Sequence, residues 1–504
     1  MILKKHLSEN LWFCYLAAFV LSAALYVATC APSVLWQDSG MFQYRIWHND
    51  VAGGLGLALA HPLYHLIGIA CKAIPFGDFA YRINLISAVA AAFAVANIFL
   101  LLRLWLKEVA PALVGTITLA LSWTFWQHAA IAEVYTLYVA IFTAELIFLY
   151  KFIETKKTIH FYLLFFFNGL SIANHMWGII PLGCYGVYVC VLLAKKKVSI
   201  LNLLLAIFCW AVGALPYLVL IVQDYLASGD IVATISSALF GNAWHSQTLN
   251  VGMTGRIVLE NIIFIGYNFP TPNIILFVIG IAAIIKSDSL RAFNRLLLAM
   301  LVLFFVFAFR YKVPDRYAFF IPFYCLAAFP FAFGAKLFFQ RFTKMFAKWA
   351  VLALALLPVL VYWIVPVVAE QMEISLGTGR KIPCRNEYTY FLRPWQMFND
   401  DPERFATEAL SGVTQNSIIF ADGTTVYPLW YTQQVKGVRP DVKIVSAHGD
   451  YKSPINYPDG DSFADIISTS SVYVVSPLKR YAPNWLLDNY DFKESGVLYR
   501  VIER

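Results

Sequence analysis

Residues 199–222 have the sequence SILNLLLAIFCWAVGALPYLVLIV, a run of 24 residues without a charged side chain. As a helix, this run is long enough to cross a hydrocarbon core of about 30 Å. Apolar segments of about 15–24 residues recur along the chain, each near the length that a crossing needs. The pattern predicts an all-α polytopic membrane domain with about eleven transmembrane helices. The predicted segments are 11–31, 80–102, 111–125, 132–150, 159–173, 177–194, 199–222, 271–285, 296–309, 317–339 and 349–368.

The amino-acid composition excludes the other broad classes of protein. Hydrophobic residues make up 60% of the 504 residues and charged residues 13%. Soluble domains average about 45–50% and about 25%. This balance excludes a soluble globular chain, a disordered chain and a coiled coil. Five of the eight cysteines fall well within apolar segments and Cys30 lies near the end of one, which argues against a scaffold held by disulfides.

The balance of charged residues along the chain changes near residue 368. Residues 1–368 carry 24 Lys and Arg against 13 Asp and Glu, whereas residues 369–504 carry 14 against 17. We therefore predict a transmembrane domain at 1–368 and an extracytoplasmic α/β domain at 369–504. The basic excess lies in short loops between apolar segments, where orientation signals belong. The net charge of +8 is therefore no indication of nucleic-acid binding.

The same charges predict the orientation in the membrane. With a cytoplasmic N-terminus, 17 of the 24 cations fall in inside loops, in agreement with the positive-inside rule. We therefore predict a multi-pass protein of the cell (inner) membrane whose C-terminal domain is extracytoplasmic. A second interpretation of the first segment stays open, because Lys4 and Lys5 followed by an apolar run also resemble a cleavable signal peptide.

Three segments on the predicted outer side, 32–79, 223–270 and 310–316, are too long or too polar to be simple turns. Residues 255–268 alternate apolar and polar residues in a way that suits a helix lying in the membrane interface. No internal repeat is found, and charges within the apolar segments are few, Glu145 being the clearest. A transporter more often has repeated halves and charges near the midplane.

The C-terminal part begins with polar, irregular sequence at 369–415. Strands are predicted at 416–421 and 441–446 with a helix at 424–435 between them, and further strands at 471–475 and 497–502. This order predicts a small α/β domain with a partly parallel sheet.

The segment Trp36-Gln-Asp-Ser-Gly40 follows the first apolar segment and places Asp38 at the predicted membrane–water boundary. A carboxylate close to lipid can have a raised pKa and can serve as a general base. Asp-Ser-Gly is also good turn chemistry, and the position alone does not separate a base from a turn or helix-capping residue.

Other polar or aromatic side chains lie at the outer ends of predicted helices. His61 precedes Pro62, which fits the first turn of a helix, so His61 could bind an anion together with free backbone N–H groups. Glu133 starts an apolar segment, where a carboxylate is costly and tends to be functional. Each also has a structural interpretation, a headgroup contact or a local hydrogen bond. The candidate substrate-binding residues of this kind are His61, Tyr64, Glu133, Asn174 and His175.

The outer loop 310–316 contains Arg310, Lys312 and Arg316 together with Asp315. A solvated loop is the ordinary explanation, but cations are disfavoured on this side of a membrane. Because Arg and Lys hold phosphate oxygens well, we predict that this loop binds the phosphate of a lipid-linked substrate. No His or Cys spacing fits a zinc site and no phosphate-binding glycine loop occurs, so we predict neither a metal site nor a cofactor.

Several of these motifs occur in one order that carries a resemblance. The blocks are Trp36-Gln-Asp-Ser-Gly-Met-Phe42, His61-Pro-Leu-Tyr64, Tyr81-Arg-Ile-Asn-Leu-Ile-Ser87, Glu133-Val-Tyr-Thr-Leu137 and Asn174-His175. Together they resemble the protein O-mannosyltransferase-like family of GT-C membrane glycosyltransferases. The segments Asp422–Tyr431 and Gly437–Asp441 resemble bacterial members, so the resemblance runs from about residue 10 to about residue 450.

The resemblance implies a many-helix membrane fold with the catalytic Asp in the first outer loop, where this chain has Asp38. It implies a polyprenyl-phosphate-linked sugar donor, with mannose as the sugar. The reaction would be transfer with inversion to an acceptor hydroxyl, either a protein Ser or Thr or a glycan. Related enzymes have two adjacent acidic residues in this loop, whereas this chain has Gln37-Asp38, which weakens the case for a bound divalent metal.

Other functions stay open at the level of sequence. Transfer of a lipid-linked sugar to a glycolipid or polysaccharide would use the same residues. A transporter or flippase for a lipid-linked sugar would share the basic outer loop but would need a path through the bundle. A purely structural membrane subunit would not need Asp38.

Overall fold

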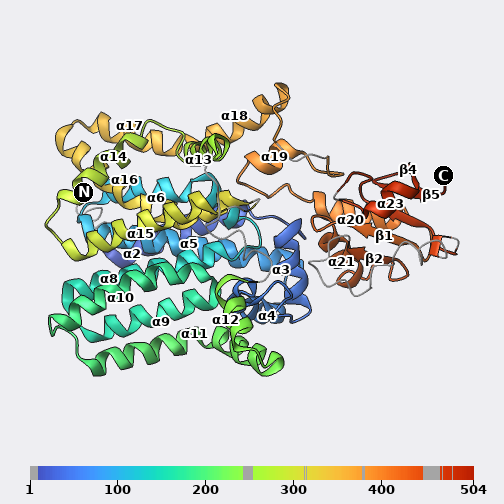
Figure 1. The fold of residues 1–504 in the computed structure, drawn as a ribbon. Coiled ribbons are helices and arrows are strands. Elements are labelled where there is room, and N and C mark those ends of the chain that lie inside the picture. Colours follow the sequence, from blue (N-terminus) through green and yellow to red (C-terminus); the bar gives the residue numbers. More distant parts are fainter. Residues whose placement is uncertain are drawn as a thin grey trace.

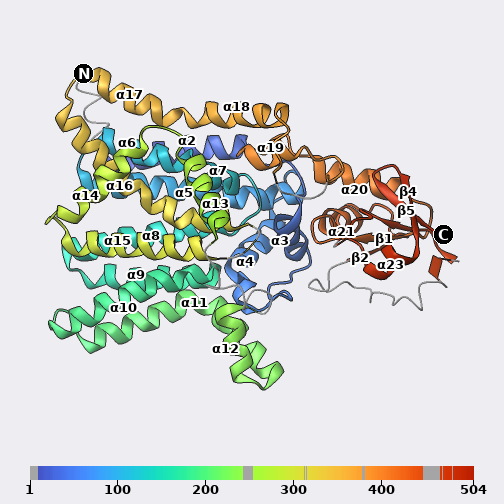
Figure 2. The same cartoon turned by 45° about the horizontal axis from the view of Figure 1, so that its top comes forward.

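The computed structural model of the chain describes residues 10–241, 254–311, 313, 315–376, 381–446, 466, 467, 469–479 and 481–504. Long helices form a bundle, and a smaller domain with a β-sheet is attached at one end of it (Figures 1 and 2). The predicted fold class, a helical membrane domain with a small C-terminal α/β domain, is confirmed.

The first half of the bundle contains α2 (Leu11–Ala28), α3 (Gln37–Trp47), α4 (Pro62–Ala70), α5 (Phe79–Leu106), α6 (Val109–Ala120), α7 (Trp123–Ala129), α8 (Tyr135–Thr155), α9 (Thr158–Asn174), α10 (Ile179–Ala194) and α11 (Ile200–Ser228). The second half contains α12 (Ile231–Phe240), α13 (Gly255–Asn268), α14 (Ile274–Lys286), α15 (Arg291–Arg310), α16 (Ile321–Arg341), α17 (Met345–Leu356) and α18 (Pro358–Gln371). Short 3₁₀ turns lie at η1 (Leu57–Leu59), η2 (Cys71–Ala73), η3 (Met176–Gly178) and η5 (Arg316–Phe320).

The number of membrane spans is lower than the eleven expected from sequence. Within the described residues, eight helical stretches are long and apolar enough to cross a membrane, and the pair α6 and α7, bent by 66°, makes a ninth. All eleven predicted segments coincide with helices. However, α9 has 17 residues and α14 has 13, short of the roughly 20 that a full crossing takes.

The two short helices join the bundle through close contacts at glycine. A Cβ added at Gly169 of α9 or at Gly213 of α11 would overlap backbone of the other helix. The same holds for Gly280 of α14 and Gly334 of α16. Small residues let helix backbones approach closely, which is how helices associate where lipid removes the hydrophobic driving force.

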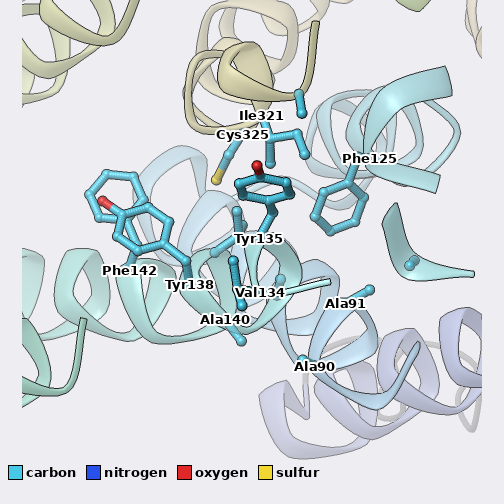
Figure 3. Close-up of a cluster of buried hydrophobic side chains, with 14 of the residues drawn as sticks. Ala90, Ala91, Phe125, Val134, Tyr135, Tyr138, Ala140, Phe142, Ile321 and Cys325 are labelled. Carbon is cyan, nitrogen blue, oxygen red and sulfur yellow. The ribbon is translucent and has the colours of Figure 1, made fainter. Parts of the chain in front are cut away.

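The core of the bundle is built around α5, α8 and α16, the most buried of the candidate spans. Figure 3 shows Tyr135 of α8 extending into this core, toward Phe125 of α7 and Cys325 of α16. Tyr138 lies beside Phe142, and the two rings stack with their centroids 5.8 Å apart. Aromatic packing therefore holds the N-terminal end of α8 in place.

The prediction of an irregular segment at 369–415 is wrong in part, because α19 (Glu387–Leu392) and α20 (Asp401–Ser411) lie within it. Acidic side chains and a proline in the first turn favour the start of α20, and one face of that helix buries Phe405. The predicted helix at 255–268 is confirmed as α13, and its location in the membrane interface stays a prediction.

The C-terminal domain contains a five-stranded sheet in the order β2-β1-β3-β5-β4. The strand β1 is parallel to β2 and β3, whereas β5 is antiparallel to β3 and β4, so the predicted partly parallel sheet is confirmed. The edge strand β4, which has no buried residue, was not predicted. The elements are β1 (Ile418–Ala421), α21 (Val426–Gln434), β2 (Lys443–Ser446), β3 (Val472–Val474), α23 (Asn484–Asn489), β4 (Asp491–Ser495) and β5 (Leu498–Ile502).

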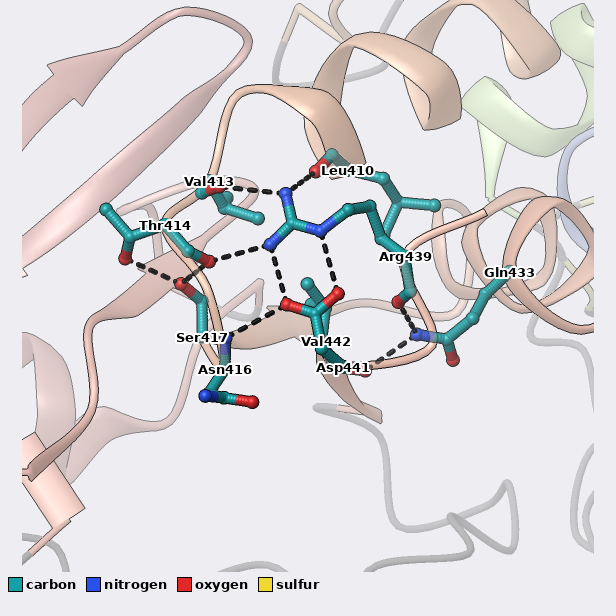
Figure 4. A network of polar contacts seen from close by, with 9 residues as sticks. All are labelled: Leu410, Val413, Thr414, Asn416, Ser417, Gln433, Arg439, Asp441 and Val442. Atoms are coloured by element: carbon teal, nitrogen blue, oxygen red, sulfur yellow. Dashed lines mark hydrogen bonds and ion pairs between the residues drawn. The ribbon is translucent and has the colours of Figure 1, made fainter. Parts of the chain in front are cut away.

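The Gly437–Asp441 motif has a structural explanation in this domain (Figure 4). Arg439 donates two hydrogen bonds of 2.8 Å to the carboxylate of Asp441. Its remaining N–H groups donate to the carbonyl oxygens of Leu410, Val413 and Thr414, at the end of α20. The paired guanidinium holds the pKa of Asp441 well below its usual range. The motif therefore ties α20 to the start of β2.

Candidate active site

Asp38 lies in the first turn of α3, at the end of the bundle that contacts the C-terminal domain. The preceding residue, Gln37, has φ of 53°, and its N–H donates to the carbonyl oxygen of Thr424 at 3.2 Å. A Cβ added at Gly40 would crowd Tyr427 of α21 and overlap the preceding backbone. Glycine is therefore required here by the backbone of Leu35, and it also lets Tyr427 of α21 approach α3 closely. Asp38 lies where these two parts of the molecule meet.

Amide side chains fix α3 to the bundle. Gln43 donates from Nε2 to Oδ1 of Asn84 on α5 at 2.7 Å, and both side chains are buried. Asn84 in turn donates to the carbonyl oxygen of Ala31 at 2.9 Å, which holds the chain between α2 and α3. Buried amides with satisfied hydrogen bonds make a rigid support, so the backbone that carries Asp38 is preorganised.

Two histidines and one asparagine form the next part of the site. His61 has φ of 52° and precedes the first turn of α4. Its Nδ1 donates to the carbonyl oxygen of Asn174 at 2.8 Å, and its ring stacks on His175 with centroids 5.1 Å apart. The Nδ1 of His175 accepts from the Trp177 N–H at 3.1 Å. These contacts leave Nε2 of His61 as an acceptor and Nε2–H of His175 as a donor when both rings are neutral.

Glu133 lies just before α8 and is buried. Its carboxylate accepts a hydrogen bond of 3.3 Å from Ser39, the neighbour of Asp38. Its backbone N–H donates to the hydroxyl of Ser87, and the Asn174 side chain donates to the next carbonyl, that of Val134, at 2.9 Å. The sequence blocks singled out by resemblance are thus linked to one another by hydrogen bonds.

These residues surround one cavity of about 810 Å³. Three carboxylic acids, Asp38, Glu133 and Asp315, line it together with His61 and His175. No Lys or Arg is among the residues that line it in the described part of the chain. The remaining lining residues are Met41, Phe42, Leu55, Leu59, Val134, Tyr135, Tyr311, Val313 and Phe319.

The crowding of carboxylic acids sets their ionisation. Desolvation, followed by the charge of Asp315, raises the pKa of Asp38 to about 7, although its side chain stays open to the water of the cavity. Desolvation and the charges of Asp38 and Asp315 raise the pKa of Glu133 well above its usual range, and desolvation also raises that of Asp315. With a pKa of about 7, Asp38 is suited to exchange a proton at neutral pH.

The histidines are held neutral by the same enclosure. Desolvation lowers the pKa of His61 to about 4 and that of His175 well below its usual value. The cavity therefore offers hydrogen-bonding imidazoles near neutral pH, with no imidazolium charge.

The cations predicted to bind phosphate do not line this cavity. Arg316 is buried and pairs with Glu260 of α13 at 2.6 Å, while its guanidinium lies 5.7 Å from the ring of Phe264. Arg310 is exposed at the end of α15, and Lys312 lies outside the described residues. The role of these three residues in binding phosphate stays a prediction.

One predicted residue packs behind the cavity without lining it, and two residues that line the cavity were not predicted. Tyr64 is buried and packs edge-on against Phe42 with ring centroids 5.5 Å apart, without lining the cavity. Tyr135 and Tyr311 also line the cavity but were not predicted to do so. Their positions near Glu133 and Asp315 in the sequence could have indicated them. The Tyr135 hydroxyl lies 3.5 Å from the Asp315 carboxylate. Within the described residues, no group of three or more His, Cys, Asp or Glu is arranged to hold a metal ion.

Comparison with known proteins gives relatives of both the sequence and the fold. Residues 56–199 match the family described as "Protein O-mannosyl-transferase TMEM260 N-terminal domain", and residues 402–448 match "TMEM260-associated domain 2". These two stretches of the chain are similar to the TMEM260 family. The Protein O-mannosyl-transferase TMEM260 of Mus musculus is 27% identical over 217 residues, which are 42% of this chain and 30% of that protein.

The fold is similar to that of ArnT. The crystal structure of ArnT from Cupriavidus metallidurans bound to undecaprenyl phosphate matches with a TM-score of 0.63, at 11% identity and 97% coverage of both chains. The apo structure of the same protein matches with a TM-score of 0.57 and the same identity and coverage. The resemblance to GT-C and O-mannosyltransferase-like proteins drawn from sequence is thereby confirmed.

Proposed function

We propose that the protein transfers mannose from a polyprenyl-phosphate-linked donor to the hydroxyl group of a protein Ser or Thr. The observation that carries the proposal is Asp38, a carboxylic acid with a pKa of about 7 in a cavity at the end of the bundle that meets the C-terminal domain. A base works best when its pKa lies near the working pH. The relationship to TMEM260 and the ArnT-like fold support the substrate class.

In the proposed reaction, the acceptor oxygen attacks the anomeric carbon while Asp38 takes the hydroxyl proton. The bond between the anomeric carbon and the phosphate oxygen breaks, and polyprenyl phosphate leaves with the electron pair. The configuration at the anomeric carbon therefore inverts. The leaving group needs no proton, and Nε2–H of the neutral His175 can donate a hydrogen bond to it.

A direct assay tests this function. The purified protein in lipid nanodiscs is incubated with polyprenyl-phosphate mannose and a pool of Ser- and Thr-containing peptides. We expect released polyprenyl phosphate and mannosylated peptide. Transfer only to an added glycolipid or polysaccharide would replace the protein acceptor. Movement of intact donor across a vesicle membrane, with no release of polyprenyl phosphate, would identify a flippase instead.

We also propose that the N-terminus lies in the cytoplasm and the C-terminal domain lies on the opposite side of the membrane. A reporter that is active only outside the cytoplasm, fused after Arg504, should be active. The same reporter placed in the basic loop after Lys196 should be inactive, because that loop carries three successive lysines. The reverse pattern would place the cavity on the cytoplasmic side and would rule out an extracytoplasmic reaction.

Arg316 provides a test of phosphate binding by the cationic loop. If Arg316 holds the donor phosphate, Arg316→Ala should lower kcat/KM for the donor by about 10- to 150-fold, the loss of one charged hydrogen bond. Glu260→Gln is the matched control, since it removes the ion-pair partner and leaves the guanidinium in place. If Arg316 only supports the fold through this pair, both variants should lose thermal stability alike while the KM for donor stays unchanged.

A further inference from the structure

A second cleft lies beside α19, which sits between the bundle and the C-terminal domain (Figures 1 and 2). Its volume is about 400 Å³. Its lining combines aromatic rings with polar groups. In the sequence, the lining residues fall between the two stretches that match the TMEM260 family. The lining residues are Thr389, Tyr390, Arg393, Trp395, Gln396, Phe398, Asn399 and Asp401.

The helix α7 connects this cleft to the cavity that contains Asp38. On one side, Gln127 donates to the carbonyl oxygen of Tyr390, and Trp126 packs on Trp395 with ring centroids 5.6 Å apart. On the other side, the ring of His128 packs on Tyr135, a residue of the cavity, at 5.2 Å. The charges of Glu133 and Asp38 also act on Tyr390. The cleft therefore adjoins the cavity across a single helix.

The floor of the cleft is a rigid turn. The Gln396 N–H donates to the carbonyl oxygen of Thr29, at the end of α2, at 2.8 Å. The Gln396 side chain donates to the carbonyl oxygen of Arg393 and accepts from the Asn399 amide at 2.8 Å. These bonds fix the turn before any ligand binds, which lowers the entropic cost of binding.

Two polar atoms of the cleft are buried and have no hydrogen-bond partner within the described residues, Nε of Arg393 and Oδ1 of Asn399. Arg393 also makes no ion pair with any described residue. The terminal nitrogens of Arg393 are not among the buried atoms, and they make no hydrogen bond with a described residue. A ligand in the cleft can therefore pair with the guanidinium of Arg393.

We propose that this cleft binds the acceptor polypeptide, in the residues that flank the reacting Ser or Thr. A polypeptide backbone offers carbonyl oxygens to the guanidinium of Arg393. Phe398, which is 75% exposed, and the rings of Tyr390 and Trp395 offer apolar contacts to its side chains. A phosphate group would also pair with Arg393 but would make no use of the three aromatic rings. The inference rests on the proposed function for the identity of the acceptor.

The test measures binding without turnover, so that it is independent of sugar transfer. The probe is a fluorescein-labelled pool of peptides with one central Thr and randomised flanking residues, added to the full-length protein in nanodiscs. We expect Arg393→Gln and Phe398→Ala to weaken binding by about tenfold or more. Lys443→Gln and Leu478→Ala are matched controls on exposed side chains of the C-terminal domain and should bind normally. Asp38→Asn should bind normally as well.

A kinetic measurement then separates this site from the chemistry. In the transfer assay, Arg393→Gln should raise KM for peptide and leave KM for donor and kcat at saturating peptide unchanged. Unchanged peptide binding in both cleft variants, absence of peptide binding by the wild type, or binding of oligomannosides in place of peptides would each overturn the inference. If the protein binds peptide through the cleft but transfers no mannose, the role of the cleft is supported and the proposed function is contradicted.

Discussion

The substitution Asp38→Asn should lower the rate of mannose transfer by about 10²–10⁴, the usual contribution of a positioned base. The reason is that Asn keeps the shape of Asp38 but cannot accept the proton of the acceptor hydroxyl. The structure gives little reason to expect misfolding. The carboxylate makes no hydrogen bond or ion pair with another described residue, and the residue that precedes α3 uses no side-chain cap. Binding of the donor should therefore persist.

A matched control separates catalysis from local structure. Asp230 accepts hydrogen bonds from Val232 and Ala233 at the start of α12, away from the cavity. Since Asn is as good as Asp at the start of a helix, Asp230→Asn should leave transfer within about twofold of the wild type. The measurement is single-turnover transfer with both variants at equal, verified folding. Near-wild-type transfer by Asp38→Asn would remove the base from the mechanism and leave Glu133 and Asp315 as candidates.

The pH dependence of transfer should be the second large effect. Asp38 must be deprotonated to act as a base, and its pKa is about 7. The value of kcat/KM should therefore rise with pH through about 7 and level off above it. Below the pKa it should fall about tenfold per pH unit, or about 100-fold over two units. A profile that is flat through this range would exclude Asp38 as the titrating base.

The neighbouring carboxylic acid, Asp315, provides a second test of this pH dependence. The charge of Asp315 helps raise the pKa of Asp38, so Asp315→Asn should move the acid limb of the profile to lower pH. Glu494→Gln, on an exposed edge strand of the C-terminal domain, should leave the profile unchanged. An acid limb that moves to higher pH in Asp315→Asn would contradict the electrostatic coupling of the two groups.

Much of the fold follows from local properties of the sequence. The eleven apolar segments all became helices, because apolar side chains in runs of this length favour a structure whose backbone hydrogen bonds are made internally. The strand–helix–strand order of the C-terminal domain was also predicted, because β1 and β2 are apolar runs bounded by turn residues. The helix α20 was missed, although its acidic first turn and the helical spacing of its apolar residues Phe405, Ala406, Ala409 and Leu410 were present in the sequence.

Some residues of the candidate site could likewise be predicted from the sequence and others could not. The motif containing Asp38, and the positions of His61, Glu133 and His175, could be selected from sequence because they belong to motifs whose order resembles a known family. The cationic loop was also selected by its charge, yet the cavity is lined by carboxylic acids and neutral imidazoles in the described residues. The pairing of Arg316 with Glu260 could not be foreseen, because the two residues are 56 positions apart.

Sequence alone was therefore enough to assign the class of the protein, its helical segments and its candidate base. These properties depend on the hydrophobicity of short segments and on local chemistry. The packed fold was needed to show that Asp38, Glu133 and Asp315 share one cavity, which sets the ionisation of each. The fold was also needed to show that the turn at 393–399 adjoins that cavity across α7. Charge interactions and ligand contacts depend on distances in space, and these distances arise only when segments far apart in the chain pack together.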